Sequence, residues 1–259
     1  MVLRILLTFG IVLASSLFML AAAILTLFQA RRFYSEVIAR WMGQVVLRFW
    51  RINYATHYAA PLPDCQTVYI SNHTSSLDVM LLISLGLPRT RFFLSGYLRK
   101  FIFVAIIGYI IRIFWTVPQE FPERRRQIFR RADRILRRTG DSVYLSPEGK
   151  CVTTGEIGHF NKGSFHLATS LKAPIVPIYI HIPAEMNPGR GYRAQPGSVG
   201  VYFLPAIDTS SWRLENLETN RDRVRALYVR VHDAMRSGGR LPDDLGVEPL
   251  QRKLMRAAV

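Results

Sequence analysis

The stretch VYISNHTSSLDVMLLISLG, residues 68–86, is the part of the sequence that best indicates the fold of this chain. Its β-branched start predicts a strand over residues 67–71, and the apolar run 76–85, ended by Gly86 and Pro88, predicts a helix. The polar residues between them follow a strand and open a helix, which is where α/β folds place functional groups. His73 and Asp78 are therefore the first candidates for chemistry.

The same alternation of strands and helices continues along the chain. Further strands are expected at residues 91–95, 142–146, 175–182 and 199–204, and further helices at residues 122–138, 163–171 and 218–235. Residues 101–117 are apolar but contain Arg112, so they predict a buried or interfacial helix that runs into a short strand. This pattern predicts an α/β fold, a mixed sheet flanked by helices.

The N-terminal residues 5–29 contain no charged side chain and are long enough to cross a bilayer as a helix. Arginines follow this segment more often than they precede it, so we expect the C-terminal bulk in the cytoplasm, at a plasma or inner membrane. The alternative is a cleaved signal peptide, because the alanines at positions 21–23 could form a cleavage site.

Residues 33–53 have apolar positions at spacings of three and four with arginines between them, which predicts an amphipathic helix. This helix would lie at the membrane interface or pack on the core of the domain. We therefore expect residues 1–55 to form a membrane-anchoring two-helix segment and residues 56–259 to form the α/β domain.

The net charge of +16 favours a polyanionic partner, either nucleic acid or an anionic membrane face. The apolar N-terminus favours the membrane. The arginine-rich helix expected at residues 122–138 is a solvated helix over the core or a contact for anionic lipid. Nucleic acid is not expected as a partner, since stacking platforms and groove-reading helices are not visible. No Cys/His pair has metal-ligand spacing, so no metal is predicted.

Asp78 lies five residues after His73, so one helical turn can bring its carboxylate back toward the imidazole. A carboxylate bonded to one imidazole nitrogen fixes the tautomer and raises the basicity of the other nitrogen. That nitrogen can take a proton from a hydroxyl as it attacks a thioester carbonyl. The alternative is a helix-capping role for Asp78.

A second loop of interest is SPEGK, residues 146–150, which follows another expected strand. FNKGSF, residues 160–165, comes shortly after it and opens a helix. Glycines let backbone N–H groups approach a ligand, and a helix N-terminus favours anions. Lys150 and Lys162 could then face a phosphate, although Pro and Gly can also serve turn geometry alone.

Together these segments resemble the glycerolipid acyltransferase family, the 1-acylglycerol-3-phosphate (lysophosphatidate) acyltransferases. NHTSSLD resembles the family's NHxxxxD box, SPEGK its FPEGT box, HFNKGSFHLA its FKxG segment and APIVPIYI its VPIVPV strand. The resemblance covers about residues 68–182. It implies acyl-CoA or acyl-carrier-protein as donor, a lysolipid acceptor and membrane lipids as partners, with no cofactor and no metal. By family role His73 is the general base, Asp78 its partner, and the substrate-binding residues are Asn72, Glu148, Gly149, Lys150, Lys162 and Gly163.

This sequence departs from the family at two expected phosphate contacts. Lys150 and Cys151 stand where the box has Thr and Arg, and residues 115–119 (WTVPQ) lack the expected arginine. Lys150, Lys162, Arg112 or Arg124 would have to substitute, or the acceptor carries no phosphomonoester, as in a lyso-aminolipid or glycolipid. A lipid-binding protein without activity is a further alternative.

Overall fold

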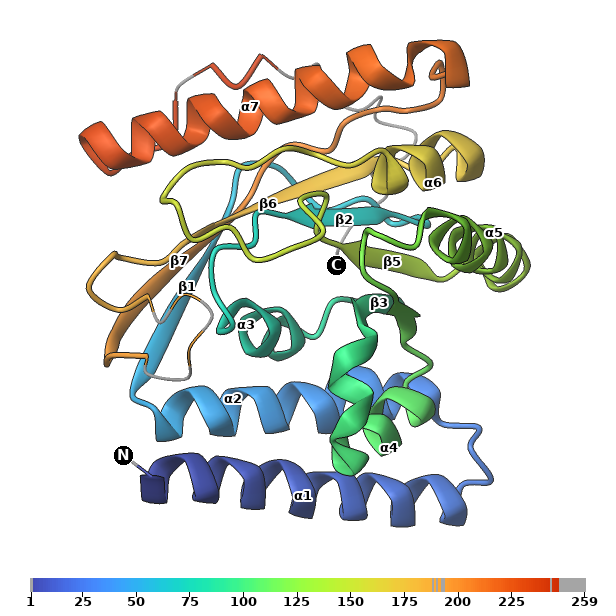
Figure 1. The fold of residues 1–259 in the computed structure, drawn as a ribbon, viewed down its shortest axis with the longest axis vertical. Coiled ribbons are helices and arrows are strands. Elements are labelled where there is room, and N and C mark those ends of the chain that lie inside the picture. The colour runs from blue at the N-terminus through green and yellow to red at the C-terminus, as the bar shows by residue number, and fades with distance from the viewer. Residues whose placement is uncertain (1, 188, 190, 192–193, 243, 247–259) are drawn as a thin grey trace.

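The computed structural model describes residues 2–187, 189, 191, 194–242 and 244–246. A seven-stranded sheet forms its centre, in the order β1-β7-β6-β2-β5-β3-β4 (Figure 1). The strands are β1 (Ile52–Tyr58), β2 (Val68–Ser71), β3 (Thr90–Ser95), β4 (Phe114–Thr116), β5 (Ser142–Leu145), β6 (Ile175–His181) and β7 (Gly197–Phe203). Only the β6–β7 pair is antiparallel among these neighbours. The mixed α/β class predicted from the sequence is therefore confirmed.

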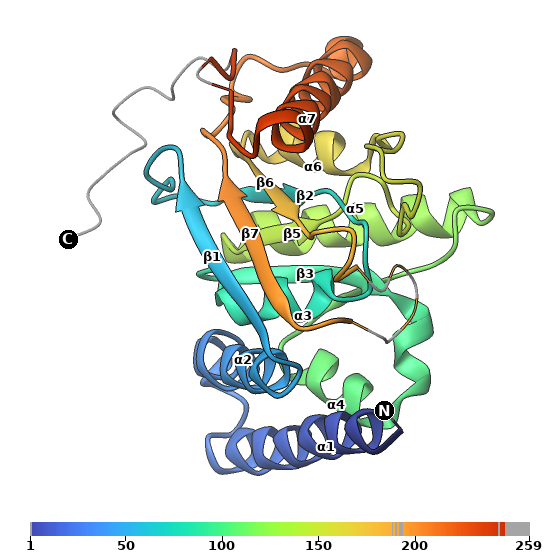
Figure 2. The same ribbon diagram turned by 90° about the vertical axis from the view of Figure 1, so that its left-hand side faces the viewer.

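Helices cover both faces of this sheet, as two perpendicular views show (Figures 1 and 2). The α-helices are α1 (Val2–Leu25), α2 (Arg40–Phe49), α3 (Asp78–Leu85), α4 (Ile102–Ile110), α5 (Pro122–Thr139), α6 (Gly163–Leu171) and α7 (Leu217–Gly238). A π-helical segment η1 (Phe33–Ala39) precedes α2, and 3₁₀ segments η2 (Gly96–Lys100) and η3 (Leu214–Asn216) precede α4 and α7.

The core has two halves because successive side chains of a strand point to opposite faces of the sheet. Val68 and Ile70 of β2 contribute to the cluster under α5, α6 and α7. Tyr69, between them, contributes to the cluster under α2, α3 and α4. The central strands β2 and β5 are buried on both faces, which explains their continuous apolar runs.

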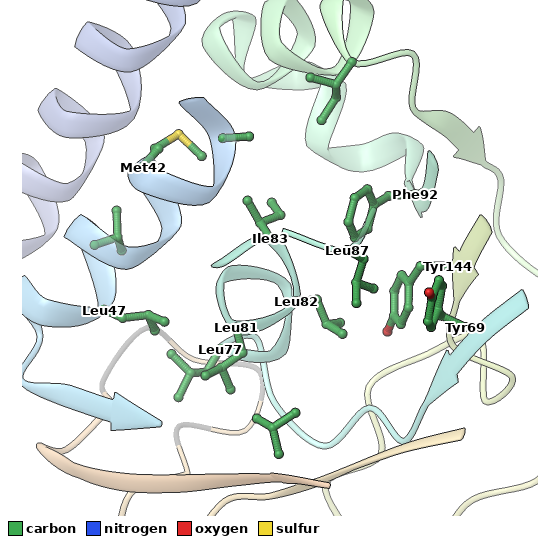
Figure 3. Packing of buried hydrophobic residues seen from close by; sticks show 14 of the residues in the cluster. Met42, Leu47, Tyr69, Leu77, Leu81, Leu82, Ile83, Leu87, Phe92 and Tyr144 are labelled. Carbon is green, nitrogen blue, oxygen red and sulfur yellow. The ribbon is translucent and has the colours of Figure 1, made fainter. Parts of the chain in front are cut away.

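Helix α3 fills the space between α2 and the sheet. Figure 3 shows its side chains among those of α2 and of the strands, with the labelled residues Met42, Leu47, Tyr69, Leu77, Leu81, Leu82, Ile83, Leu87, Phe92 and Tyr144. Gly43 permits the close approach of α2, because a Cβ there would lie 3.0 Å from the backbone nitrogen of Ser84. The start of α3, and with it the NHTSSLD loop, is thereby held between two layers.

Helix α1 forms the outermost layer and runs antiparallel to α2 (Figure 1). Its buried residues recur at helical spacing along one face: Val12, Ser15, Ser16, Met19 and Ala23. The two small serines allow close packing of neighbouring helices. By length and composition α1 could cross a membrane, as the sequence predicts, yet in this structure it lies along the domain.

The predicted elements agree with the observed ones except near the N-terminal boundary. The helix expected over residues 33–53 is divided into η1 and α2 and ends at Phe49. Strand β1 has no predicted counterpart, because it is an edge strand whose residues are mostly polar or exposed. The expected domain boundary, between residues 55 and 56, falls inside β1.

An ion-pair cluster ties the segment after α1 to the sheet. Arg91 Nε donates to Asp141 Oδ2 at 2.7 Å, and Arg31 pairs with the other carboxylate oxygen. Arg91 and Asp141 are both buried. Burial alone would raise the pKa of Asp141, but hydrogen bonds from Arg91 and Thr139 and the Arg31 charge outweigh it and lower the pKa.

We expect Asp141→Asn to lower the free energy of unfolding by about 3–5 kcal/mol at neutral pH, because it leaves buried guanidinium charge unpaired. The loss would shrink in acid, since stability from a carboxylate of depressed pKa disappears as pH falls through that pKa. Denaturant titrations of the variant and of Glu123→Gln, which breaks an exposed pair with Arg126, would measure this. Equal effects of the two substitutions would contradict it.

Candidate active site

Asn72 anchors the loop that leaves β2. Its Nδ2 donates to the carbonyl of Ile180 at 2.9 Å, and its Oδ1 accepts from the N–H of Ile180 at 2.8 Å. The side chain thus pairs with the backbone of β6 and is only 2% exposed. Its position supports an anchoring role rather than the substrate contact suggested by the family resemblance.

Asp78 organises the turn that carries His73. Its Oδ2 contacts His73 Nδ1 at 2.8 Å and accepts the backbone N–H groups of Thr74 at 2.9 Å and Ser75 at 3.1 Å. Asp78 is buried, whereas the His73 side chain is 25% exposed. With the proton on Nδ1, the carboxylate leaves His73 Nε2 as the unprotonated nitrogen. Asp78 therefore combines the expected His contact with two hydrogen bonds to the backbone of the turn before α3.

Glu148 holds the main chain of His73 from the other side. Its Oε2 accepts the N–H of His73 at 2.6 Å, and its Oε1 accepts the N–H of Gly158 at 2.7 Å. Burial raises the pKa of Glu148 to about 7, although both hydrogen bonds oppose that shift. The N–H of Val152 also donates to the His73 carbonyl at 2.7 Å, so the backbone of His73 is fixed at both ends.

A cavity of about 810 Å³ opens beside His73. Its walls come mainly from apolar side chains of α1 to α4 and of β3, among them Val12, Met42, Leu82, Phe92 and Ile107. Polar side chains also line the cavity, among them His73, Ser76 and Lys150. Sites for small molecules have roughly this size, with apolar walls and a few placed polar groups.

The remaining predicted substrate-binding residues divide into two groups. Gly149 and Lys150 line the cavity. Lys162 does not, and its Nζ forms an exposed ion pair with Glu218. Gly163 opens α6 against the ring of Phe129, which a Cβ would approach to 2.6 Å. The geometry thus gives Lys162 and Gly163 structural contacts outside the cavity.

Arg125 and Gln119 line the cavity but are absent from the predicted site. Arg125 is half-buried at the start of α5, and its Nη1 donates to the carbonyl of Val117 at 2.9 Å. A Cβ at Gly149 would lie 3.0 Å from Gln119 Nε2 and 3.8 Å from Arg125 Nη2. The sequence shows eight arginines in this helix, and nothing in their spacing indicates that this one reaches the SPEGK loop.

The sequence and the fold resemble those of known acyltransferases. Residues 54–181 match the family model described as acyltransferase. Through this segment, just under half of its length, the chain is similar to the acyltransferase family. The resemblance drawn from the four sequence boxes is confirmed.

Two relatives are named as 1-acyl-sn-glycerol-3-phosphate acyltransferases. The chloroplast protein of Arabidopsis thaliana is 32% identical over 161 residues, 61% of this chain and 44% of that protein. The protein of Haemophilus influenzae is 25% identical over 210 residues, 77% of this chain and 79% of its own length. The chain thus spans less than half the length of its Arabidopsis relative.

The fold also matches a solved acyltransferase structure. The 1-acyl-sn-glycerophosphate (LPA) acyltransferase from Thermotoga maritima superposes with a TM-score of 0.65 and 19% identity, covering 88% of this chain and 96% of that one. This likeness supports the mixed sheet with flanking helices found here. Among the described residues, no group of three His, Cys, Asp or Glu side chains could hold a metal ion.

The raised pKa of Glu148 predicts a specific pH dependence of stability. A carboxyl whose pKa rises from 4.5 when unfolded to about 7 when folded stabilises most below pH 4.5, and this contribution is lost as pH rises through 7. We expect Glu148→Gln to lack this component. Denaturant unfolding of both proteins between pH 4 and pH 8, about the range of the two pKa values, measures the difference. Parallel curves would show that Glu148 does not titrate there.

Proposed function

We propose that this protein transfers a fatty acyl group from a thioester donor to the hydroxyl of a lysolipid. The observation that carries the proposal is the His73–Asp78 pair, whose side chains lie 2.8 Å apart and line a mainly apolar cavity. The match to the acyltransferase family model and the names of the relatives support the same reaction. A lysophosphatidate acceptor and an acyl-CoA or acyl-carrier-protein donor are the corresponding substrates.

In the proposed reaction His73 Nε2 takes the proton of the acceptor hydroxyl. The acceptor oxygen forms its bond to the thioester carbonyl carbon, and the carbon–sulfur bond then breaks. The departing thiolate receives the proton from His73, so neither a cofactor nor a covalent enzyme intermediate is required. Asp78 stabilises the imidazolium that exists between the two proton transfers.

The apolar cavity would hold the acyl chain during this transfer. Its lining residues come from the sheet and from the layer of α1, α2 and α4, and they include His73. An apolar chain gains free energy by leaving water for such walls. The thioester carbonyl would then lie where the chain ends, next to the imidazole.

Arg125 and Lys150 would bind the acceptor head group. Both line the cavity, whereas Arg124 lies over the ring of Phe121 and Lys162 pairs with Glu218. Burial lowers the pKa of Arg125, with the charge of Glu120 opposing. A guanidinium can donate two parallel N–H hydrogen bonds to two oxygens of one phosphate group. We therefore favour a phosphate-bearing acceptor over a lyso-aminolipid or glycolipid.

The outer helical layer would seat the protein on a membrane. Helix α1 exposes many large apolar side chains, and α4 adds Ile102 and Tyr109. Exposed apolar surface of this extent marks a membrane or protein contact. This arrangement would let the cavity, which α1 and α4 border, receive lipid from the bilayer. The cytoplasmic orientation remains a prediction from the arginine distribution.

We expect His73→Ala to lower kcat by about 10²–10⁴-fold, because a general base contributes that much. Asp78→Asn should also lower kcat strongly, through loss of the correct tautomer. Steady-state assays with a labelled acyl donor and lysophosphatidate measure both effects. Full activity of His73→Ala would refute the proposed base. Lysolipid binding by the wild type without transfer from either donor would favour a non-catalytic lipid-binding protein.

We expect Arg125→Gln to raise the KM for lysophosphatidate by about 10- to 100-fold, the loss of a charged hydrogen bond. The KM for the acyl donor should change little. Arg124→Gln is the matched control, since Arg124 is exposed and does not line the cavity. If wild-type enzyme acylates a lyso-aminolipid but not lysophosphatidate, the head-group assignment is wrong.

A further inference from the structure

The loop between β5 and α6, residues 146–162, meets α7 on the side of the sheet opposite the cavity. Arg225 of α7 is half-buried and donates from Nε to the carbonyl of Gly158 at 2.8 Å. Its Nη2 donates to the carbonyl of Ile157 at 2.9 Å. One guanidinium therefore holds two consecutive carbonyls of the loop.

The carbonyl of Ile157 and the N–H of Gly158 belong to the same peptide unit. Because that unit is planar and trans, its C=O and N–H point in opposite directions. Arg225 holds the carbonyl end, and Glu148 Oε1 accepts the N–H end at 2.7 Å. Glu148 Oε2 in turn accepts the N–H of His73 at 2.6 Å. Hydrogen bonds thus connect α7 continuously to the backbone of His73.

The position of Gly158 leaves no room for a side chain. A Cβ there would lie 2.7 Å from a methyl carbon of Val152 and 3.1 Å from Glu148 Oε1. The peptide lies between a cation and a carboxylate, and each charge polarises it in the same sense. Hydrogen bonds arranged in such a chain strengthen one another.

Helix α7 is itself fixed to the centre of the sheet. The Tyr228 hydroxyl, one turn after Arg225, donates to the carbonyl of Ile70 at 2.9 Å and accepts the N–H of Ile178 at 3.1 Å. Tyr228 is fully buried. Ile70 lies in β2, the strand that leads into His73. The same helix therefore fixes both the strand before His73 and the loop that holds His73 laterally.

Other contacts from α7 to this loop involve residues other than Ile157 and Gly158. His232 Nε2 contacts the carbonyl of Gly155 at 2.9 Å, and Arg236 pairs with Glu156 at 2.8 Å. Both members of the second pair are more than half exposed, and such surface pairs contribute little. Arg225 is the α7 side chain that reaches the peptide bonded to Glu148.

We propose that Arg225 is a positioning residue that holds His73 in its working geometry through the Gly158 peptide and the Glu148 carboxylate. This inference rests on the proposed acyl transfer with His73 as base. Arg225 touches neither the cavity nor the His73 side chain, so its effect passes through the two intermediates.

The test compares Arg225→Ala, Arg225→Lys and the control Arg223→Ala in the full-length protein. Arg223 is exposed on the same helix, two residues away. Arg225→Ala should lower kcat by about 10- to 100-fold, as expected for a small displacement of a catalytic group, with KM values nearly unchanged. Lys can hold one carbonyl, so kcat should recover partly in Arg225→Lys. Arg223→Ala should match wild type.

The pH dependence of kcat/KM distinguishes the proposed role of Arg225 from a general loss of packing, which would leave the position of the profile on the pH axis unchanged. Glu148 faces His73, Asp78, Tyr144 and Tyr228. If Arg225→Ala weakens the hydrogen bond from the Gly158 N–H to Glu148, the pKa of Glu148 rises further and its protonated form is favoured. The acidic limb of the kcat/KM profile should therefore move to higher pH in Arg225→Ala and stay in place in Arg223→Ala.

Hydrogen–deuterium exchange tests the same connection without any substrate. Peptides containing the amides of His73 and Gly158 should exchange faster in Arg225→Ala, while those from β2 and α6 stay protected. Unchanged exchange at both amides, or a kcat within twofold of wild type, would overturn the proposal. Faster exchange throughout the domain would also overturn the proposal, because Arg225 would then stabilise the whole fold and would not specifically position His73. If wild type transfers no acyl group at all, the proposed function fails while the exchange result still decides the connection.

Discussion

A buried carboxylate at the first residue of α3 is the constraint on which the site depends. Asp78 accepts three N–H groups from the turn before it, one of them on the His73 ring. The same contacts hold the turn before the helix and orient the imidazole. Separating the two roles is impossible here, because one oxygen makes all three contacts. The packing of α3 between α2 and the sheet in turn determines where that oxygen lies (Figure 3).

The sheet places the second half of the site next to the first. Strands β2 and β5 are parallel neighbours, so their carboxyl ends lie at the same edge. The loop after β2 carries His73, and the loop after β5 carries Glu148. These residues are 75 positions apart in the sequence, and the backbone N–H of His73 donates to the Glu148 carboxylate at 2.6 Å. The positioning of His73 is thus a property of the topology as much as of its local motif.

Much of this could be predicted from the sequence, since apolar periodicity and turn residues mark the strands and helices well. The His73–Asp78 contact follows from a spacing that one helical turn can close. Strand β1 could not be predicted, because an edge strand needs no apolar run. Arg125 and Arg225 were also beyond reach, because each is one arginine among several on its helix. Only tertiary packing determines which of them turns inward.

For Lys150 and Lys162 the sequence predicted a site role for both residues and could not tell which of them reaches the cavity. Each lies beside a glycine in a loop that suits anion binding, yet of the two only Lys150 borders the cavity, while Lys162 pairs with Glu218. Helix α1 shows what packing adds to composition. Its residues Ile5, Phe9 and Val12 line the cavity, while much of its remaining surface is apolar and exposed. If that outer surface contacts lipid, the membrane would affect the position of α1 and so the shape of one wall of the cavity. Bilayer fluidity and thickness would then influence which chain lengths the protein accepts.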